Sequence, residues 1–210
     1  MIAPSNSANL AQHDRFEMFR LRHRVFKQRL QWEVPTVADM ERDEFDNCNP
    51  VYMLARNDQR QICGCWRLLP TTGPYMLKDT FPQLLHGAPA PVDPDIWELS
   101  RFAVAKRDEG GFHVTTIPLH MIQSVFRHAF AHGIKRYVTV TTVAVERMMR
   151  HLGLRCIRMG EPVQIGIEKT VAFYIDVDAH VHQLLHLDQP ISFDLIGMPS
   201  EYTLPERLAA

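Results

Sequence analysis

The chain has 210 residues, of which 46% are hydrophobic and 22% are charged, a composition typical of one soluble globular domain with its own core. Its formal net charge of −1 argues against a general nucleic-acid-binding protein, which usually carries a large basic excess. No apolar run reaches the length of about 18 residues that a membrane span needs, and the stretch Met1–Ala11 lacks the pattern of a secretory signal. We therefore expect a cytoplasmic protein.

The N-terminal quarter predicts a helix, a loop and two strands. From Gln12 to Leu30, large side chains recur at alternating spacings of three and four, which predicts an amphipathic helix whose buried side carries Phe16, Phe19, His23, Phe26 and Leu30. The stretch 31–50 is polar and acidic, holds two prolines and predicts a loop. Val51–Arg56 and Ile62–Leu69 are rich in β-forming residues, and the Asn57-Asp58 turn between them predicts an antiparallel hairpin.

The remainder predicts alternating strands and helices. Residues 70–94 contain six prolines and two glycines, which leaves room only for a short helix within Met76–Leu85. Further elements are expected, in chain order, as a strand at 97–104, a helix at 118–132 ended by Gly133, a strand at 137–142, a helix at 143–152 ended by Gly153, and a strand at 170–177. This order predicts an α/β fold, a mixed central β-sheet flanked by helices in a single domain over 1–210.

Polar residues interrupt the strand at 97–104, where an apolar run is expected. Glu98, Ser100 and Arg101 lie within it, and Arg67 stands near the end of an earlier strand. A buried charge needs a partner or a polar cavity, and the loop at 31–50 offers the acids Glu41, Asp43, Glu44 and Asp46. Two interpretations stay open: a structural ion-pair network, or a pocket for a polar, cationic ligand. Strict alternation also separates Glu98 from Arg101, so we expect a bulge or different tasks for the two faces.

Signatures of other chemistry are absent from the sequence. It contains no HExxH pair, GxSxG elbow, phosphate-binding P-loop or GxGxxG fingerprint. The four cysteines form no CxxC pair, so we expect buried free thiols, with Cys63 and Cys65 on one face of their strand. The sequence therefore predicts no metal site.

From about Arg22 to about Val177, the chain resembles the LuxI-type acyl-homoserine-lactone synthases. The resemblance is densest in four motifs, which are Arg22-x3-Phe26-x5-Trp32, Glu41-x-Asp43-x2-Asp46, the segment from Cys63-Gly64-Cys65-Trp66-Arg67 to Tyr75-Met76-Leu77, and Trp97-Glu98-Leu99-Ser100-Arg101-Phe102. No single motif is specific, but their combined order and spacing are. Members that make 3-oxo-acyl products of medium to long chain are the most similar in appearance.

The resemblance implies an N-acetyltransferase-like fold with an acyl-chain cleft, and an enzyme that makes a quorum-sensing signal. It implies that the amine of S-adenosylmethionine attacks an acyl thioester, usually on acyl carrier protein, and that its carboxylate then displaces methylthioadenosine to close the lactone. S-adenosylmethionine is thus a substrate, and no cofactor is implied. Residues 1–50 would close over its site, and 178–210 would form a C-terminal tail.

The resemblance, joined to the chemistry, suggests roles for the charged and aromatic residues. Glu98, or Glu41 through a water molecule, would be the general base, with Arg101 beside them; their competing task is to form ion pairs. Adenosylmethionine binding or the ion-pair network would use Arg22, Phe26, Trp32, Asp43, Asp46 and Arg67. Aromatic faces attract a sulfonium ion, although simple helix packing is an equally good explanation for Phe26.

For the acyl chain, the resemblance points to Ser100, Phe102, Leu119, Ile122, Thr139 and Thr141. The Thr139 hydroxyl would donate to a 3-oxo group with help from Ser100, although threonine is also simply a good strand former. Arg147 and Arg150 would dock the acidic carrier protein, or would belong to an ordinary exposed basic face. Two other functions remain as alternatives: a general N-acyltransferase that uses acyl-CoA, although its phosphate-binding signature is missing, and a non-catalytic adenosylmethionine-binding relative.

Overall fold

The computed structural model describes residues 1–106 and 117–189, and these form two compact units. Unit 1 contains Met1–Arg67 and the described part of Arg101–Val125, and unit 2 contains Leu68–Ser100 and Phe126–Asp188. Part of the predicted C-terminal tail lies outside the described residues, and the prediction of a single domain stays a prediction. Among the described residues, no helix has the length and apolar character needed to cross a membrane.

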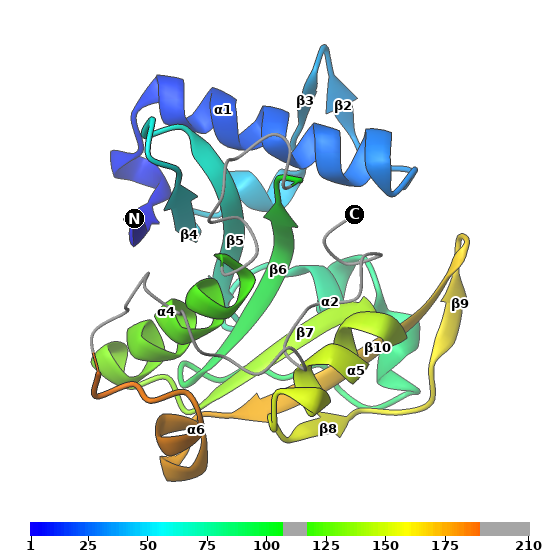
Figure 1. Ribbon diagram of the computed structural model, residues 1–210. Coiled ribbons are helices and arrows are strands. Elements are labelled where there is room, and N and C mark those ends of the chain that lie inside the picture. The colour runs from blue at the N-terminus through cyan, green and yellow to red at the C-terminus, as the bar shows by residue number, and fades with distance from the viewer. Residues whose placement is uncertain (107–116, 190–210) are drawn as a thin grey trace. The chain divides into compact units, whose positions relative to one another are not determined.

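Unit 1 combines a four-stranded sheet with a long N-terminal helix and a small hairpin (Figure 1). Its strands lie in the order β1-β4-β5-β6, and β1 pairs antiparallel with β4 from Ile2 opposite Ala55 to Asn6 opposite Val51. The elements are β1 (Ile2–Asn6), η1 (Ser7–Asn9), α1 (Gln12–Arg22), η2 (His23–Arg29), β2 (Thr36–Val37), β3 (Met40–Glu41), η3 (Glu44–Asn47), β4 (Val51–Arg56), and the unit 1 parts of β5 (Ile62–Pro70), β6 (Ile96–Val104) and α4 (Ile117–His132).

The predicted N-terminal helix exists, but its second part is π-helical and its buried side differs from the prediction. The α-helix ends at Arg22, and residues 23–29 continue as a π-helix. Phe19 and Phe26 are buried as predicted, whereas Phe16 is 37% exposed and His23 is half-buried. The buried stripe instead contains Arg22, which is completely inaccessible. A hydropathy pattern counts arginine as polar, so it could not find this side of the helix.

The loop at 31–50 is mostly irregular, as predicted, but it contains short elements that orient its acids. Strands β2 and β3 form a two-stranded hairpin in which Thr36 is opposite Glu41. The turn η3 is closed by a capping box. The Asp43 carboxylate accepts from the backbone amides of Phe45 and Asp46, and the Asp46 carboxylate accepts from the backbone amide of Asp43. Local hydrogen bonds therefore fix the directions of both aspartates.

Unit 2 is a mixed sheet with helices around it. Its strands lie in the order β6-β7-β10-β8, with β9 also on β10; β7 runs parallel to β6, and β10 runs antiparallel to β7 and β8. Helix α5 lies along β7 and β10 (Figure 1). The remaining elements are α2 (Met76–Asp79), η4 (Pro82–Leu85), β7 (Arg136–Thr142), α5 (Val143–His151), β8 (Cys156–Arg158), β9 (Val163–Ile165), β10 (Glu168–Asp176) and α6 (Ala179–Leu184). The predicted α/β class with a mixed, helix-flanked sheet is confirmed.

Both predicted glycine stops are confirmed, because Gly133 and Gly153 follow α4 and α5 with φ angles of 72° and 87°. The predicted irregularity in β6 is present at Arg101, whose φ of 58° lies in the left-handed region within the strand. Such a residue breaks the alternation of side chains between the two faces, as β-bulges do. Besides the short elements in the loop at 31–50, the described residues contain elements that were not predicted, namely β1, η1, β8, β9 and α6.

Candidate functional site

Six charged side chains form a buried cluster in unit 1, called here the charged cluster. Its members are three arginines and three acids: Arg22, Arg67, Arg101, Glu41, Asp43 and Asp46. They come from the end of α1, from β5 and β6, and from the β3–η3 segment, and all six were predicted from the sequence. Their formal charges cancel, three positive against three negative. This balance is what allows so many charges to be buried together.

Asp46 is the centre of the charged cluster. Its carboxylate accepts hydrogen bonds from Arg22 Nη1 and Nη2 at 2.7 and 3.1 Å, from Arg67 Nη1 at 2.9 Å, from the Tyr52 hydroxyl at 2.7 Å, and from the Asp43 backbone amide at 2.9 Å. Five donors on two oxygens satisfy the carboxylate completely. Tyr52, which supplies one of them from β4, was not identified from the sequence.

Glu41 and Asp43 connect the arginines to one another. Glu41 accepts from Arg22 Nε at 2.5 Å through one oxygen and from Arg101 Nε at 3.0 Å through the other. Asp43 accepts from Arg67 and lies 2.8 Å from Arg101 Nη2. The predicted network role of Asp43 and Asp46 therefore matches the geometry, and Glu41 performs the ion-pairing task that competes with its proposed role as a base.

Burial and opposite charges act against each other on the pKa values of the cluster. Burial alone would raise the pKa of Asp46, but Arg22 and Arg67 hold it well below its usual range. Burial would lower the pKa of Arg22, and Asp46 and Glu41 nevertheless raise it well above its ordinary value. For Arg101, burial prevails over the attraction of Glu41 and Asp43, and the pKa is lowered. Arg101 is also the arginine of the three whose side chain keeps some exposure, 10% against 0%.

Aromatic rings pack against the charged cluster. Phe26 and Trp32 are stacked, with ring centroids 5.4 Å apart and an interplanar angle of 9°, and the Arg101 guanidinium lies 5.6 Å from the Phe26 centroid. Phe26 is buried, whereas Trp32 keeps part of its surface accessible. Of the two predicted aromatic residues, Trp32 is therefore the one with accessible surface, and the ligand-binding role of both stays a prediction.

Glu98 lies in unit 2 and is held differently from the acids of the cluster. It is fully buried, and its two oxygens accept from the backbone amides of Met76, at 3.1 Å, and Leu77, at 2.8 Å. These amides are at the start of α2, where free N–H groups favour an anion. The motif Tyr75-Met76-Leu77 was part of the sequence resemblance, but its use as a double amide donor was not foreseen, because backbone donors leave no mark in side-chain patterns.

The predicted acyl-binding residues are divided between the two units. Phe102, Leu119 and Ile122 are in unit 1, whereas Ser100, Thr139 and Thr141 are in unit 2. Ile122, Ser100 and Thr139 are buried, and the other three are half-buried. Their role as an acyl-binding set stays a prediction.

The Thr139 hydroxyl is already engaged. Its Oγ1 lies 2.8 Å from the Leu99 carbonyl oxygen on the neighbouring strand β6. A carbonyl can only accept, so the threonine proton is used in this bond, and the hydroxyl offers lone pairs to other groups. The predicted donation to a 3-oxo group, itself an acceptor, therefore requires the Leu99 bond to break.

The two predicted docking arginines on α5 differ in their surroundings. Arg147 is exposed. Arg150 is exposed as well, but it donates to Glu146 at 2.9 Å and to the Cys156 carbonyl at 2.5 Å, and Arg158 binds the same glutamate at 2.8 and 2.7 Å. Arg150 thus contributes to an ion-pair network that joins α5 to β8, a structural task that was not predicted.

The cysteines and one group of potential metal ligands bear on the predictions of free thiols and of no metal site. All four cysteines are free, with Cys63, Cys65 and Cys156 buried, as predicted. In the described residues, one trio has ligand atoms within 4.8 Å of one another, and it consists of exposed His13 and half-buried Asp14 and Glu17. Asp14 in this trio is bound by Arg56 at 2.7 Å. The prediction that the protein needs no metal stays a prediction.

Comparison with known proteins adds an independent line of evidence. The family described as "Autoinducer synthase" matches residues 6–185. An acyl-homoserine-lactone synthase of Pseudomonas aeruginosa is 45% identical over 172 residues, which cover 81% of this chain and 86% of that protein. The solved structure of the AHL synthase LasI superposes with a TM-score of 0.81 at 42% identity, over 89% of this chain and 94% of that one.

Two more distant solved structures extend the comparison. The CoA-dependent acyl-homoserine lactone synthase BjaI, solved with SAM and isopentyl-CoA, has a TM-score of 0.80 at 28% identity, over 90% of each chain. A putative N-acetyltransferase from Lactobacillus plantarum, at 13% identity and a TM-score of 0.57 over 84% of this chain and 99% of that one, shares the fold alone.

Fold and relatives together define the class of this protein, which is an acyltransferase built on the N-acetyltransferase-like fold. Within that class, the chain belongs to the autoinducer synthase family, whose curated members matched here are acyl-homoserine-lactone synthases.

Proposed function

We propose that the protein makes an acyl-homoserine lactone from S-adenosylmethionine and an acyl group carried by acyl carrier protein. In the first step the methionine amine attacks the thioester carbonyl, an amide bond forms, and the carrier thiol leaves. In the second step the carboxylate oxygen attacks the carbon next to the sulfonium, the carbon–sulfur bond breaks, and neutral methylthioadenosine departs. Both substrates are cytoplasmic metabolites, so the proposal places the enzyme in the cytoplasm.

The observation that carries this proposal is the charged cluster. S-adenosylmethionine presents an ammonium, a carboxylate and a sulfonium, so its site needs charges of both signs in fixed positions. The cluster holds such charges rigidly beside the Phe26–Trp32 stack, with Arg101 as its partly exposed edge. Arg101 would bind the substrate carboxylate, and Trp32 would face the sulfonium.

Glu98 is our proposed general base for removal of the proton from the amine. Each oxygen of Glu41 already accepts a hydrogen bond from a guanidinium group, Arg22 Nε on one and Arg101 Nε on the other, so Glu41 has a task in the ion-pair network. The Glu98 oxygens accept from the backbone amides of Met76 and Leu77, and these bonds hold its buried carboxylate in a fixed position. Glu41 then acts as a positioning residue for Arg101.

The test replaces Glu98 by glutamine and follows methylthioadenosine and lactone together by mass spectrometry. Glu98→Gln keeps the size of the side chain and removes the base, so we expect kcat to fall by about 10²- to 10⁴-fold. Glu44→Gln is the matched control, because Glu44 is an exposed glutamate of the loop that carries the cluster acids. A Glu98→Gln enzyme that keeps kcat within threefold of the wild type, roughly the scatter between preparations, would remove Glu98 from the chemistry.

The carrier and the acyl group form the finer part of the proposal. The exposed cation Arg147 supports an acidic carrier protein as donor, whereas the resemblance to BjaI favours coenzyme A. Comparing kcat/KM for one acyl chain on the two carriers decides between them. The resemblance at Thr139 supports a 3-oxo-acyl donor, on condition that the hydroxyl exchanges its Leu99 partner for the substrate.

A further inference from the structure

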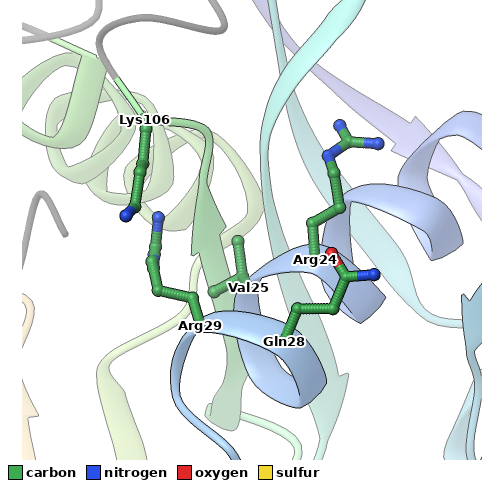
Figure 2. Close-up of a pocket in the computed structure, with 5 residues that line it drawn as sticks. All are labelled: Arg24, Val25, Gln28, Arg29 and Lys106. Atoms are coloured by element: carbon green, nitrogen blue, oxygen red, sulfur yellow. The ribbon is translucent and has the colours of Figure 1, made fainter.

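Arginines gather at two places in unit 1, and their side chains are arranged differently. Beside η2 lies a pocket of about 220 Å³, whose lining consists of Arg24, Val25, Gln28, Arg29 and Lys106. Figure 2 shows that the Arg24 side chain points away from the other two cations of this lining. In the charged cluster, by contrast, Arg22 and Arg67 both donate to one oxygen of Asp46, at 2.7 and 2.9 Å. The position of this oxygen, Oδ1, therefore decides where two guanidinium groups lie.

Tyr52 is the third donor to the same oxygen. It belongs to β4, it is 2% exposed, and its hydroxyl donates to Asp46 Oδ1 at 2.7 Å. Burial, and after it the negative charge of Asp46, raise the pKa of Tyr52 above its ordinary value, so the phenol keeps its proton at neutral pH and remains a donor. Among the donors that the described residues give to the Asp46 side chain, Tyr52 is the one neutral side chain. Removing its hydroxyl would change the geometry of the cluster and leave the charge balance intact.

Tyr52, like Arg67, connects the loop that carries the acids to the sheet. Asp46 lies in η3, and its Oδ2 accepts from the Asp43 amide of the same loop, a bond that makes no connection to the sheet. Strand β4 pairs with β1 on one side and with β5 on the other, so its backbone is held on both sides. Side chains on such strands are placed more precisely than side chains on loops. The Tyr52 hydroxyl therefore gives Asp46 a fixed point.

Two chains of ion pairs lead from Asp46 to Arg101. The residues between them are Arg22 and then Glu41 in one chain, and Arg67 and then Asp43 in the other. At the far end, Arg101 Nε donates to Glu41 at 3.0 Å, and Arg101 Nη2 lies 2.8 Å from Asp43. A displacement of Asp46 Oδ1 would thus reach the Arg101 guanidinium through both of these acids.

We propose that Tyr52 is a positioning residue of the adenosylmethionine site, which acts through Asp46 to orient Arg101 toward the substrate carboxylate. The inference rests on the proposed function, in which Arg101 binds that carboxylate. A guanidinium group binds a carboxylate through N–H bonds of fixed direction, so a small rotation weakens the pairing. Without the hydroxyl, Asp46 Oδ1 is held by the two arginines alone and moves with them.

The experiment replaces Tyr52 by phenylalanine, which keeps the ring and removes the hydroxyl, and measures the binding of two ligands by calorimetry. S-adenosylhomocysteine and methylthioadenosine both carry a neutral sulfur, and they differ in the amino-acid portion that holds the carboxylate. Tyr52→Phe should weaken S-adenosylhomocysteine about tenfold and methylthioadenosine by less than about threefold, because misplacing Arg101 affects the ligand with the carboxylate. In turnover, KM for S-adenosylmethionine should rise about tenfold while kcat changes by less than about threefold.

Two controls separate positioning from stability. Tyr174→Phe is the matched substitution, because Tyr174 is a half-buried tyrosine of β10 in unit 2, and it should keep the wild-type ratio of the two dissociation constants. In an Arg101→Met background, Tyr52→Phe should change that ratio by less than about threefold, since its effect passes through Arg101. Urea unfolding and the calorimetric stoichiometry give the folded, binding-competent fraction of each variant, and a loss of stability alone lowers this fraction without changing the ratio.

Several results would overturn the inference. A Tyr52→Phe variant that keeps the wild-type ratio, or that weakens both ligands equally, would give Tyr52 a purely structural role. A full effect of Tyr52→Phe in the Arg101→Met background would show that it does not act through Arg101. If the wild type bound neither ligand, the proposed function would fail and this inference with it, whereas a wild type that binds both, with an unchanged ratio in Tyr52→Phe, refutes the inference alone.

Discussion

Replacing Asp46 by asparagine tests whether the charged cluster stabilises the fold through balanced charge. The substitution preserves the size of the side chain and removes one of three negative charges that face three arginines. The Asp46 carboxylate accepts hydrogen bonds from Arg22, Arg67 and Tyr52. Asparagine places an NH₂ group, which is itself a donor, where one of the carboxylate oxygens was, so some of these three donors would lose their acceptor. One uncompensated positive charge would then remain in the buried cluster.

The expected cost follows from burial. Arg22 and Arg67 are completely inaccessible and the Asp46 side chain is 1% exposed, so water cannot replace the lost partner. Breaking a buried ion pair by removing one member costs about 3–5 kcal/mol. For a chain of this size, each kcal/mol changes the melting temperature by about 2–4 °C, so Asp46→Asn should lower it by at least about 6 °C.

Asp39→Asn provides the matched control. Asp39 accepts from Arg20 Nε at 2.8 Å, a bond of the same chemistry and similar length, but both side chains are about half exposed. We expect little change in its stability, because solvent screens the pair. Urea unfolding followed by circular dichroism measures both variants, and the slope with urea shows whether the unfolding transition stays comparable.

Two outcomes would refute the reasoning. If Asp46→Asn lost less than about 1 kcal/mol, the cluster would not behave as a buried, balanced set. If Asp39→Asn were as damaging as Asp46→Asn, burial would not be the cause of the difference.

Three further predictions concern pH, selectivity and packing. The folded-state pKa of Asp46 is depressed, so its contribution to stability is present at neutral pH and is lost as the pH falls below about 4. In Asp46→Asn, the free energy of unfolding should therefore depend less on pH in that range, and an unchanged dependence would contradict the pKa shift. Thr139→Val removes the hydroxyl that binds Leu99 and should lower kcat/KM for 3-oxo-acyl donors about tenfold more than for unsubstituted ones, whereas equal loss for both donors would indicate packing alone. Gly64→Ala places a methyl group 2.8 Å from a buried methionine sulfur and should cost about 1–3 kcal/mol in urea unfolding, while Gly73→Ala, with no atom within 4 Å, should cost little; equal costs would show that the strand adapts.

The sequence predicted the charged cluster well because burying charges breaks the ordinary apolar pattern of a strand. Arg67 and Arg101 stood out in β-rich segments, and the three acids stood out by their density in one loop. The pairing could not be derived in the same way. The two backbone amides at the start of α2 that donate to Glu98 were not foreseen, because such donors are identical for every residue type.

The errors in the fold have physical reasons as well. Strand β1 contains a proline and lies at the edge of its sheet, so its short sequence lacks the alternation of a typical strand. Strands β8 and β9 have three residues each, too few for a period to be recognised. The prediction of which residues of the N-terminal helix are buried missed Arg22, because the acids that make its burial possible, Glu41 and Asp46, lie 19 and 24 residues further along the chain.

The π-helix at 23–29 is a segment in which the number of residues matters for the structure around it. It directly follows Arg22, which belongs to the charged cluster, and it carries Phe26, whose ring stacks on Trp32. Deleting a single residue there would rotate the residues after the deletion, relative to those before it, by about 100° around the helix axis, because each residue of an α-helix turns by that angle. Family members should therefore tolerate substitutions in this turn far more readily than insertions or deletions, since a change in phase would separate Arg22 from the Phe26–Trp32 stack.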